Sequence, residues 1–298
     1  MKYDKWLKLN THNLTSKTAV ITGSTGGLGV EICKTLAKLN CNLILLNRNL
    51  DKSNKQKEEL LKINPNTKID IIQLDLCDID EVTYVANKLK HIKFNYLIHN
   101  AGVYNVPIEK TNTRFNNIFT TNFVSPYYLT NSLLSYLKEN NIKAIIVSSI
   151  AHNYSKIDEN NIDFSTHKKS SKIYGNSKRF LTFALMELFK ENNYTNYAIC
   201  HPGITLTNMT NHYPKSINWL VKILIKIFFI SPKKASFNII KSMFENTKEN
   251  QWIGPKYFNI WGYPNKKQLN TCNDDEKQKI YKITQNIYNY LKQEKTDI

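Results

Sequence analysis

The stretch Val20-Ile21-Thr22-Gly23-Ser24-Thr25-Gly26-Gly27-Leu28-Gly29 decides the fold of this chain. Its apolar start leads directly into four glycines within seven residues. Strand, glycine turn and helix together predict a cradle for a dinucleotide, because glycines let the backbone approach a pyrophosphate whose charge lies at the helix N-terminus. The alternative is a flexible strand-to-helix loop, and the rest of the chain decides between the two. The apolar residues of the helix that follows share one face: Leu28, Ile32, Leu36 and Leu39.

Outward from this stretch, predicted strands and helices alternate. Apolar runs bounded by helices on both sides predict a parallel sheet of about seven strands that is buried on both faces, and right-handed crossovers make the fold a doubly wound α/β fold. Strands are expected at Thr18–Thr22, Leu43–Leu46, Ile69–Leu74, Tyr96–Ile98, Ala144–Ser148, Tyr197–Cys200 and Ile253–Phe258. Helices are expected at Gly27–Leu39, Asp51–Ile63, Asp78–Lys90, Arg114–Leu137 and Ile173–Lys190, with a loop over 151–171.

Length and composition fit one globular domain, or at most two. The chain has 298 residues and a net charge of +17, which raises nucleic acid or an anionic membrane as partners. No run of five or more basic residues occurs, and nothing resembles a zinc finger or a basic recognition helix. We therefore favour a lysine-rich surface over a nucleic-acid interface, and no metal site is expected.

The cysteines and the N-terminal sequence indicate the cellular compartment of the protein. The five scattered cysteines form no CxxC pair, which predicts free thiols in a reducing compartment. Residues 1–17 lack the apolar stretch of a signal peptide, and no run of about 18 apolar residues could span a bilayer. We expect a cytoplasmic protein, and association with a membrane surface stays open.

Small or polar residues follow every predicted strand, where ligands of such folds bind. These residues are the glycines of the first turn, then Asn47 and Arg48, Asp75 and Leu76, Asn100 to Gly102, Ser148 and Ser149, and Pro202 and Gly203. Their repetition at six strand ends favours the dinucleotide cradle over the flexible loop.

Tyr174 and Lys178 are four residues apart on a predicted helix and therefore share one face. A nearby ammonium favours the phenolate and lowers the pKa of a tyrosine, which makes that tyrosine a general acid or base near pH 7. Ser149 ends a strand, and its hydroxyl could donate a hydrogen bond to a substrate carbonyl oxygen. A chance Tyr-x-x-x-Lys pair is the alternative in a chain rich in both residues.

Four motifs together resemble those of the short-chain dehydrogenase/reductase family. Thr22–Gly29 matches its TGxxxGxG, Asn100–Gly102 its NAG, Tyr174–Lys178 its YxxSK, and Pro202–Thr207 its PGxxxT. His99 stands where a second Asn is usual in that family. The resemblance covers about residues 16 to 265 and implies a single-domain Rossmann-type fold that binds a nicotinamide cofactor.

The resemblance also implies the roles of individual residues. Tyr174 would donate or accept the proton, and Lys178 would lower its pKa and bind the nicotinamide ribose. Ser149 would polarise the carbonyl, and Asn122 would hold a water next to Lys178 or, as the alternative, only kink its helix. The residues expected to bind the cofactor are Gly23, Ser24, Thr25, Gly27, Leu28, Gly29, Asn47, Arg48, Asp75 (to the adenine), Leu76, Asn100, Ala101, Gly102, Tyr174, Lys178, Pro202, Gly203 and Thr207.

The residues after the second strand indicate which nicotinamide is used. An acidic residue there would accept from the ribose 2′-hydroxyl, but the sequence reads Asn47-Arg48. A guanidinium suits a 2′-phosphate, so NADP is expected. Stacking of Arg48 on the adenine, which would also permit NAD, stays open.

The spacing between Ser149 and Tyr174 indicates a branch of the family. Ser149 and Tyr174 are 174 − 149 = 25 residues apart, about twice the usual separation. Together with Ser148–His152 and His201–Gly203, this spacing resembles the retinol dehydrogenase-like branch, which implies a lipophilic alcohol, aldehyde or ketone as substrate. The chain is expected to be a monomer or a homodimer.

An apolar segment, 217–230, lies in the region 204–230 where that family places its substrate-covering segment. It contains Lys222 and Lys226 on one helical stripe. A wall of the substrate pocket, a contact with the membrane interface and an oligomer contact all stay open. We expect an N-terminal arm at 1–16, a catalytic domain at 17–265 and a C-terminal helix at 266–298 packed on that domain.

Three other functions stay open. The chain could be a dinucleotide-binding regulator without catalysis, although the intact Ser149, Tyr174 and Lys178 argue against this. It could be a basic scaffold docked on an anionic membrane, without turnover of a cofactor. It could also be a sugar-nucleotide epimerase, although such an enzyme would require a larger C-terminal domain than the residues after 203 can form.

Overall fold

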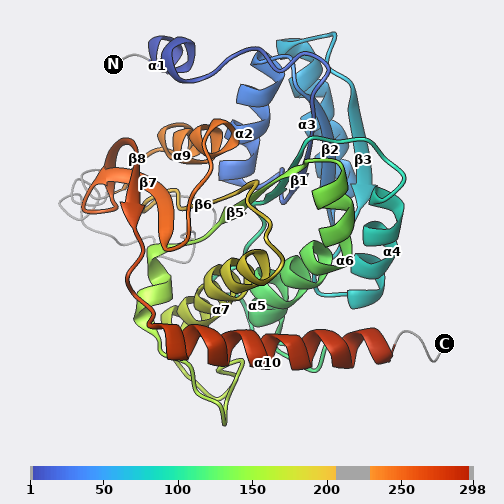
Figure 1. Cartoon of the computed structure of the whole chain (residues 1–298). Coiled ribbons are helices and arrows are strands. Elements are labelled where there is room, and N and C mark those ends of the chain that lie inside the picture. The colour runs from blue at the N-terminus through green and yellow to red at the C-terminus, as the bar shows by residue number, and fades with distance from the viewer. Residues whose placement is uncertain (1–2, 206–228, 295–298) are drawn as a thin grey trace, which may run out of the picture.

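The computed structural model describes residues 3–205 and 229–294, and every structural statement below concerns this part of the chain. Its centre is a single sheet flanked by helices (Figure 1). Eight strands lie in the order β3-β2-β1-β4-β5-β6-β7-β8. They are β1 (Thr18–Thr22), β2 (Asn42–Asn47), β3 (Ile69–Gln73), β4 (Tyr96–His99), β5 (Lys143–Val147), β6 (Tyr197–Cys200), β7 (Gln251–Tyr257) and β8 (Trp261–Gln268).

The predicted α/β fold with a parallel sheet is confirmed, with one difference. Strands β1 to β7 pair in parallel, whereas β8 is an additional edge strand antiparallel to β7. Buried parallel strands appear in a sequence as apolar runs, but β8 is mostly exposed and six of its eight residues are Gly, Pro, Asn, Lys or Gln, so no such run marks it. The chain reverses its direction across the sheet between β1 and β4, and this switch point is where such folds bind ligands.

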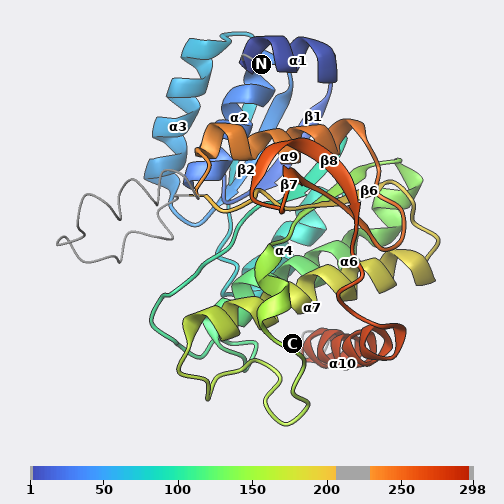
Figure 2. The same cartoon turned by 90° about the vertical axis from the view of Figure 1, so that its left-hand side faces the viewer.

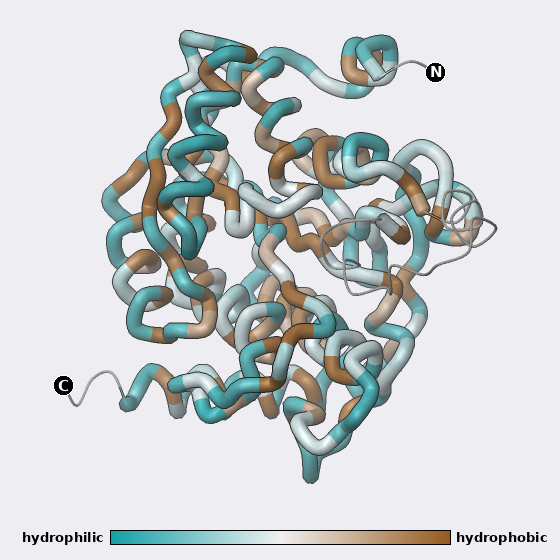
Figure 3. Tube along the Cα trace, turned by 180° about the vertical axis from the view of Figure 1, so that it is seen from behind, coloured by the Kyte–Doolittle hydropathy of each residue, from teal (hydrophilic) through white to brown (hydrophobic). Residues whose placement is uncertain are grey.

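Helices cover both faces of the sheet (Figures 1 and 2). One face carries α2 (Gly27–Lys38), α3 (Leu50–Ile63) and α9 (Pro232–Phe244), and their apolar residues share a core with β1 and β2. The other face carries α4 (Ile79–Leu89), α6 (Ser125–Glu139) and α7 (Ser170–Glu191), which enclose the larger core. Apolar residues accordingly gather along the sheet and the inner helix faces (Figure 3).

The two ends of the described chain add elements outside these layers. Helix α1 (Tyr3–Asn10) lies within the predicted N-terminal arm and packs on α9, where the Trp6 and Phe237 rings stack at 4.4 Å between centroids. Helix α10 (Asp274–Gln293) runs along the outer side of α7 (Figure 1). Its buried residues Ile280, Ile287 and Leu291 join the larger core.

Two local predictions differ from the structure. The helix expected at Arg114–Leu137 is divided into α5 (Asn117–Phe119), the π-helical turn η1 (Thr120–Val124) and α6. The loop expected at 151–171 overlaps the 3₁₀ turn η2 (Ile150–Tyr154). All five residues of this π turn are buried, so this stretch has no amphipathic pattern in which the extra residue of the turn could be recognised.

Two general features bear on function. The five cysteines are unpaired, and all but Cys77 are buried. Among the helices of the described residues, none combines the length and the apolar character needed to cross a membrane.

Candidate active site

The glycine turn between β1 and α2 is built by close packing. Gly23 has a φ of +66°, and a Cβ placed on it would lie 2.8 Å from the Cα of Ala101. A Cβ on Gly29 would lie 2.3 Å from the Gly23 carbonyl oxygen. Only glycine therefore fits at either place, and the first predicted motif packs directly on the second.

The N-terminus of α2 is available to an anion. Gly26 caps the helix without any side-chain hydrogen bond, and the first turn contains no acidic residue. The backbone N–H groups of this turn, which includes Gly27, Leu28 and Gly29, lack the partners that the helix interior provides. Thr25 immediately precedes this cap. Such a terminus attracts a phosphate through its N–H groups and the helix dipole.

A buried polar cluster holds the turn from behind. Asn47 Oδ1 accepts from the Ser24 N–H at 2.8 Å, and Asn47 Nδ2 donates to Ser24 Oγ at 2.7 Å. Gln56 of α3 accepts from Ser24 Oγ at 2.7 Å and donates to the Ser24 carbonyl at 2.8 Å. The side chains of Ser24 and Asn47, predicted to bind the cofactor, are therefore engaged with each other and with Gln56. The role of the Ser24 and Asn47 side chains is to fix the shape of the turn.

Arg48, Asp75 and Leu76 lie beyond the ends of β2 and β3. The Arg48 side chain is 75% exposed, and its Nη1 lies 3.6 Å from Asp75 Oδ2. The backbone N–H of Asp75 donates to the Glu81 carboxylate at 2.6 Å. Leu76 is buried, and its carbonyl accepts from Ser125 Oγ at 2.6 Å. The exposed Arg48 guanidinium therefore lies beside the Asp75 carboxylate, at the edge of the region where the adenine is predicted to bind.

Asn100, Ala101 and Gly102 follow β4 and join the cofactor turn to the predicted catalytic residues. Asn100 Nδ2 donates to the carbonyls of Thr22 at 3.1 Å and Gly23 at 2.9 Å, whereas its buried Oδ1 has no partner within the described protein. A Cβ on Gly102 would lie 3.5 Å from Lys178 Nζ. This backbone therefore runs between the glycine turn and Lys178.

The three expected catalytic side chains come together at the end of β5. Ser149 follows β5, and its side chain lies beside that of Tyr174. Tyr174 and Lys178 lie one turn apart on α7, and Lys178 Nζ donates to the Val147 carbonyl at 3.0 Å. Gly175 permits this approach, because a Cβ there would lie 2.5 Å from the Ala151 carbonyl oxygen. The sequence spacing alone does not determine any of these contacts.

The electrostatics of Tyr174 differ from the expectation. Burial raises the pKa of Tyr174 to about 12, against the opposing effect of its hydrogen bond with Ser149. Burial lowers the pKa of Lys178 to about 8. The Lys178 ammonium lies 5.9 Å from the centre of the Tyr174 ring and points at the Val147 carbonyl. Desolvation of the phenol therefore outweighs the expected lowering of its pKa by Lys178.

Asn122 lies in the π turn η1 and is completely buried. Its side chain forms a pair of hydrogen bonds with the backbone of Val103, at 2.8 Å from the Val103 N–H and 3.0 Å to the Val103 carbonyl. It also donates to Ser177 Oγ at 3.0 Å. Asn122 thus occupies the helix irregularity that was one of its two expected roles, and π turns often accompany functional sites.

The remaining predicted residues are Pro202, Gly203 and Thr207, and the structure also adds residues that were not predicted. Pro202 and Gly203 follow β6, where His201 Nδ1 accepts from the Gly203 N–H at 3.1 Å. Thr207 and residues 206–228, which include most of the segment 217–230, lie outside the described residues. Ser177 and Val103 were not predicted. Ser177 is the serine of the YxxSK match, which was the available signal, whereas nothing in the sequence singles out Val103.

The residues present fit a nicotinamide dinucleotide. The free N-terminus of α2 suits a pyrophosphate, and the unpartnered Oδ1 of Asn100 is an acceptor for a hydroxyl group. Both lie at the switch point between β1 and β4. Among residues 3–205 and 229–294, no three His, Cys, Asp or Glu side chains are grouped to hold a metal ion.

Comparisons with known proteins identify relatives of this chain. Residues 17–218 match the family model described as short chain dehydrogenase. The chain is 34% identical over 220 residues to short-chain dehydrogenase TIC 32 A of Brassica napus, covering 68% of each chain. It is 28% identical to polyprenol dehydrogenase of Homo sapiens (81% of this chain, 76% of the relative) and 28% identical to retinol dehydrogenase 11 of Mus musculus (75% and 72%).

Solved structures share the fold. A protein of Mycobacterium paratuberculosis superposes with a TM-score of 0.70 at 20% identity, over 93% of this chain and 95% of that one. A short-chain dehydrogenase of Sphingobium yanoikuyae in complex with NADPH superposes with a TM-score of 0.59 at 17% identity, over 75% and 83%.

Proposed function

The chain belongs to the short-chain dehydrogenase/reductase family, as an NAD(P)-dependent oxidoreductase acting on alcohols or carbonyls, and from this premise we propose that it transfers hydride between NADP(H) and a lipophilic alcohol, aldehyde or ketone. One observation carries the proposal: the side chains of Ser149 and Tyr174 meet beside buried Lys178, next to the backbone at Gly102 that follows β4. A nucleotide-binding regulator would not need this arrangement.

The proposed roles follow from these positions. The bound nicotinamide supplies the hydride in reduction and accepts it in oxidation. In reduction, Tyr174 gives its hydroxyl proton to the carbonyl oxygen, and Ser149 donates a hydrogen bond to the same oxygen. Lys178 keeps a positive charge beside the phenol, and Asn122 holds the Val103 backbone against the α7 helix through Ser177.

A lipophilic substrate is supported by the side chains around Tyr174. The ring of Tyr104 packs edge-on against that of Tyr174 at 5.2 Å between centroids, and Tyr154 is exposed on the neighbouring turn. Val103 and Val106 pack on a small apolar cluster beneath them. Aromatic and aliphatic walls favour binding of an apolar molecule with few polar groups. The relatives named for polyprenol and retinol agree with this class of substrate.

The preference for NADP is supported by Arg48. Its guanidinium is exposed at the end of β2, and among residues 3–205 and 229–294 it has a single ion pair, with Asp75 at 3.6 Å, so it is available to a 2′-phosphate.

The direct test is a panel of aliphatic, retinoid and steroid carbonyls with NADPH, read at the cofactor absorbance, beside a Tyr174→Phe variant. We expect oxidation of NADPH with a lipophilic carbonyl and its loss in the variant. Tight NADPH binding without turnover of any member of the panel would favour the regulator.

A contact with a membrane surface is the second candidate, and the β7–β8 hairpin favours it. Phe258 at its tip is 83% exposed, and Tyr257 and Tyr263 are also exposed. Residues 251–272 contain three lysines and no acidic residue. Exposed aromatic rings flanked by lysines suit an anionic membrane interface. The backbone hydrogen bond from Ile230 to Ile204, at 2.9 Å, brings both ends of the region 206–228 to this side of the sheet.

Flotation with vesicles tests the membrane contact. We expect wild-type protein to float with vesicles of mixed phosphatidylserine and phosphatidylcholine, and Phe258→Glu to float less. Tyr84→Glu is the matched control, since Tyr84 is 64% exposed on α4, away from the hairpin. If the wild-type protein stays in solution, the membrane contact is refuted, and the proposed oxidoreductase activity is unaffected.

A further inference from the structure

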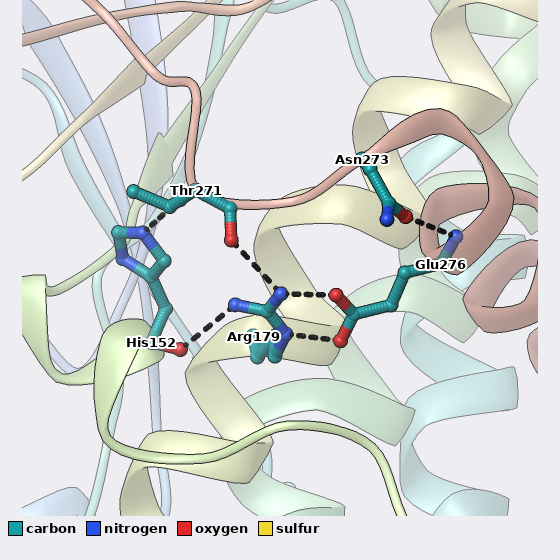
Figure 4. Close-up of polar contacts among 5 residues, drawn as sticks. All are labelled: His152, Arg179, Thr271, Asn273 and Glu276. Carbon is teal, nitrogen blue, oxygen red and sulfur yellow. Dashed lines mark hydrogen bonds and ion pairs between the residues drawn. The ribbon is translucent and has the colours of Figure 1, made fainter.

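Arg179, the residue after Lys178, is buried and faces away from the cofactor side into a charged cluster (Figure 4). Its Nε donates to Glu276 Oε1 at 2.7 Å and its Nη2 to Glu276 Oε2 at 2.5 Å. The exposed fractions of the two side chains are 3% and 17%. Such a two-point pair fixes the relative orientation of α7 and α10, because both hydrogen bonds must align at once.

The remaining donors of Arg179 reach two other segments. Nη1 donates to the His152 carbonyl at 3.2 Å, and Nη2 also donates to the Thr271 carbonyl at 2.9 Å. His152 belongs to the turn η2, and Thr271 belongs to the link between β8 and α10. Asn273 in the same link caps α10 by accepting from the Glu276 N–H at 2.9 Å. One guanidinium therefore ties α7 both to the turn η2 and to the continuous stretch formed by the β8–α10 link and the start of α10.

The His152 ring continues this cluster to Ser149. Its Nδ1 lies 2.6 Å from the Ser149 carbonyl oxygen, and its Nε2 lies 2.7 Å from Thr271 Oγ1. A carbonyl oxygen only accepts, so Nδ1 carries the proton, and Nε2 accepts from the threonine hydroxyl. Burial, together with the charge of Arg179, lowers the pKa of His152 to about 4, against the opposing bond to Ser149. The ring is thus neutral and in one tautomer.

The turn that bears Ser149 is held from a second side as well. Ser149 Oγ accepts from the Ala151 N–H at 3.2 Å, and the Ala151 carbonyl lies against Gly175. Rotation of the Ser149 peptide would therefore redirect the hydroxyl that meets Tyr174. The bond from His152 to the Ser149 carbonyl opposes that rotation.

We propose that the C-terminal helix is part of the positioning apparatus of the active site. The Arg179–Glu276 pair holds Thr271 and His152 in place, and these two residues fix the Ser149 peptide. All four are positioning residues, since they act through Ser149 and not on the substrate. This inference rests on the proposed function, because it assigns a consequence for proton transfer at Ser149 and Tyr174.

The decisive variant is Thr271→Val, which removes the hydroxyl donor but preserves the shape. Thr271 is exposed as a residue, so the substitution leaves the core intact. Thr15→Val is the matched control, because Thr15 is an exposed threonine whose hydroxyl also donates to a side chain, Asn13 Oδ1 at 2.7 Å. Thr271→Ser restores the donor and should rescue the effect.

The measurements are kcat, KM for the carbonyl, the affinity for NADPH and the ¹⁵N shifts of the His152 ring. For Thr271→Val we expect a fall in kcat of about tenfold, since small misplacement of a catalytic group is costly. NADPH affinity and thermal stability should stay close to wild type, and the ring should show a mixture of tautomers. Thr15→Val and Thr271→Ser should resemble the wild-type enzyme.

The outcomes separate this inference from the proposed function. Turnover by the wild-type enzyme that Thr271→Val retains in full would overturn the positioning role and leave the oxidoreductase assignment intact. A fall in kcat matched by an equal loss of NADPH affinity would also overturn it, because the effect would then be general. Absence of turnover by the wild-type protein with every carbonyl would overturn both.

Discussion

The two halves of the ligand-binding edge are supported from behind by polar clusters of opposite character. Behind the glycine turn, Ser24, Asn47 and Gln56 form a neutral cluster whose longest hydrogen bond spans 32 residues. Behind Ser149, the charged Arg179–Glu276 pair spans 97 residues. The neutral cluster therefore lies within the consecutive elements from β1 to α3, whereas the catalytic half depends on docking of the C-terminal helix. The comparison implies that cofactor binding and catalysis can be lost separately.

The largest effect is expected where the catalytic half meets the substrate. Tyr174→Phe removes the hydroxyl that transfers the proton, and general acid–base catalysis of this kind contributes about a hundredfold to ten-thousandfold to rates. We expect kcat to fall by about a thousandfold while the NADPH dissociation constant, measured by fluorescence, hardly changes.

Tyr136→Phe is the control for this change. It also removes a hydroxyl with a backbone partner, the Ile92 carbonyl at 2.8 Å, but lies on α6 away from the site. A Tyr174→Phe enzyme that loses NADPH affinity in parallel with activity would contradict the separation of the two halves.

The second prediction compares the stability of the two clusters. Glu276→Ala leaves the Arg179 guanidinium buried without its carboxylate, and breaking such a pair costs about 3 to 5 kcal/mol of unfolding free energy. Gln56→Ala removes a neutral partner of Ser24 and should cost only about 1 to 3 kcal/mol. Urea unfolding followed by circular dichroism measures both.

Glu294→Ala controls for the loss of an ion pair as such. Glu294 pairs with Arg114 at 2.7 Å, but both side chains are well exposed, so the cost should stay below about 1 kcal/mol. Equal destabilisation by Glu276→Ala and Gln56→Ala would remove the distinction between a charged and a neutral support.

The third prediction concerns pH. The pKa of His152 is lowered to about 4 by burial first, below the usual 6.5. The folded protein thus binds fewer protons than the unfolded chain between these values, and its stability, complete above pH 6.5, is lost as the pH falls towards 4. His152 alone should account for about 2 to 3 kcal/mol of this loss.

Buried His99 and His201 add to the acid sensitivity in the same direction, because burial lowers the pKa of each to about 3. His152→Gln should therefore flatten only part of the pH dependence of the urea midpoint. His91→Gln, at an exposed histidine, should leave it unchanged. An unaltered slope in His152→Gln would mean that His152 is not held neutral in the folded protein.

The contrast between the two halves also explains what the sequence could predict. The glycine turn is local, so the apolar run, the glycines and the helix that follows lie next to one another in the chain and could be interpreted together. Tyr174 and Lys178 could be found because one helical turn separates them. The parallel sheet could be predicted because apolar runs bounded by helices on both sides indicate strands buried on both faces.

The rest depends on contacts that no spacing encodes. Arg179 looks like any residue of an amphipathic helix until Glu276 is brought against it. The sequence predicts a lowered pKa for Tyr174, whereas the structure gives a raised one. A sequence shows that Lys178 is a neighbour, but not that its ammonium donates to the Val147 carbonyl. Desolvation of the phenol is likewise a property of the packed structure.

The smallest expected effect tests the rim of the cofactor half. Arg48 lies outside the neutral cluster, and its exposed ion pair with Asp75 contributes little to stability. Arg48→Ala should therefore leave unfolding unchanged but lower the ratio of kcat/KM for NADPH to that for NADH by about tenfold, which corresponds to about 1.4 kcal/mol. Arg114→Ala, at another exposed and ion-paired arginine, should not alter the ratio. A tenfold preference of the wild-type enzyme for NADH would refute the NADP assignment. Such a preference would also mean that Arg48 contacts Asp75 and the adenine. Specificity for the cofactor, like the shape of the glycine turn, would then come from the buried residues of the cofactor half.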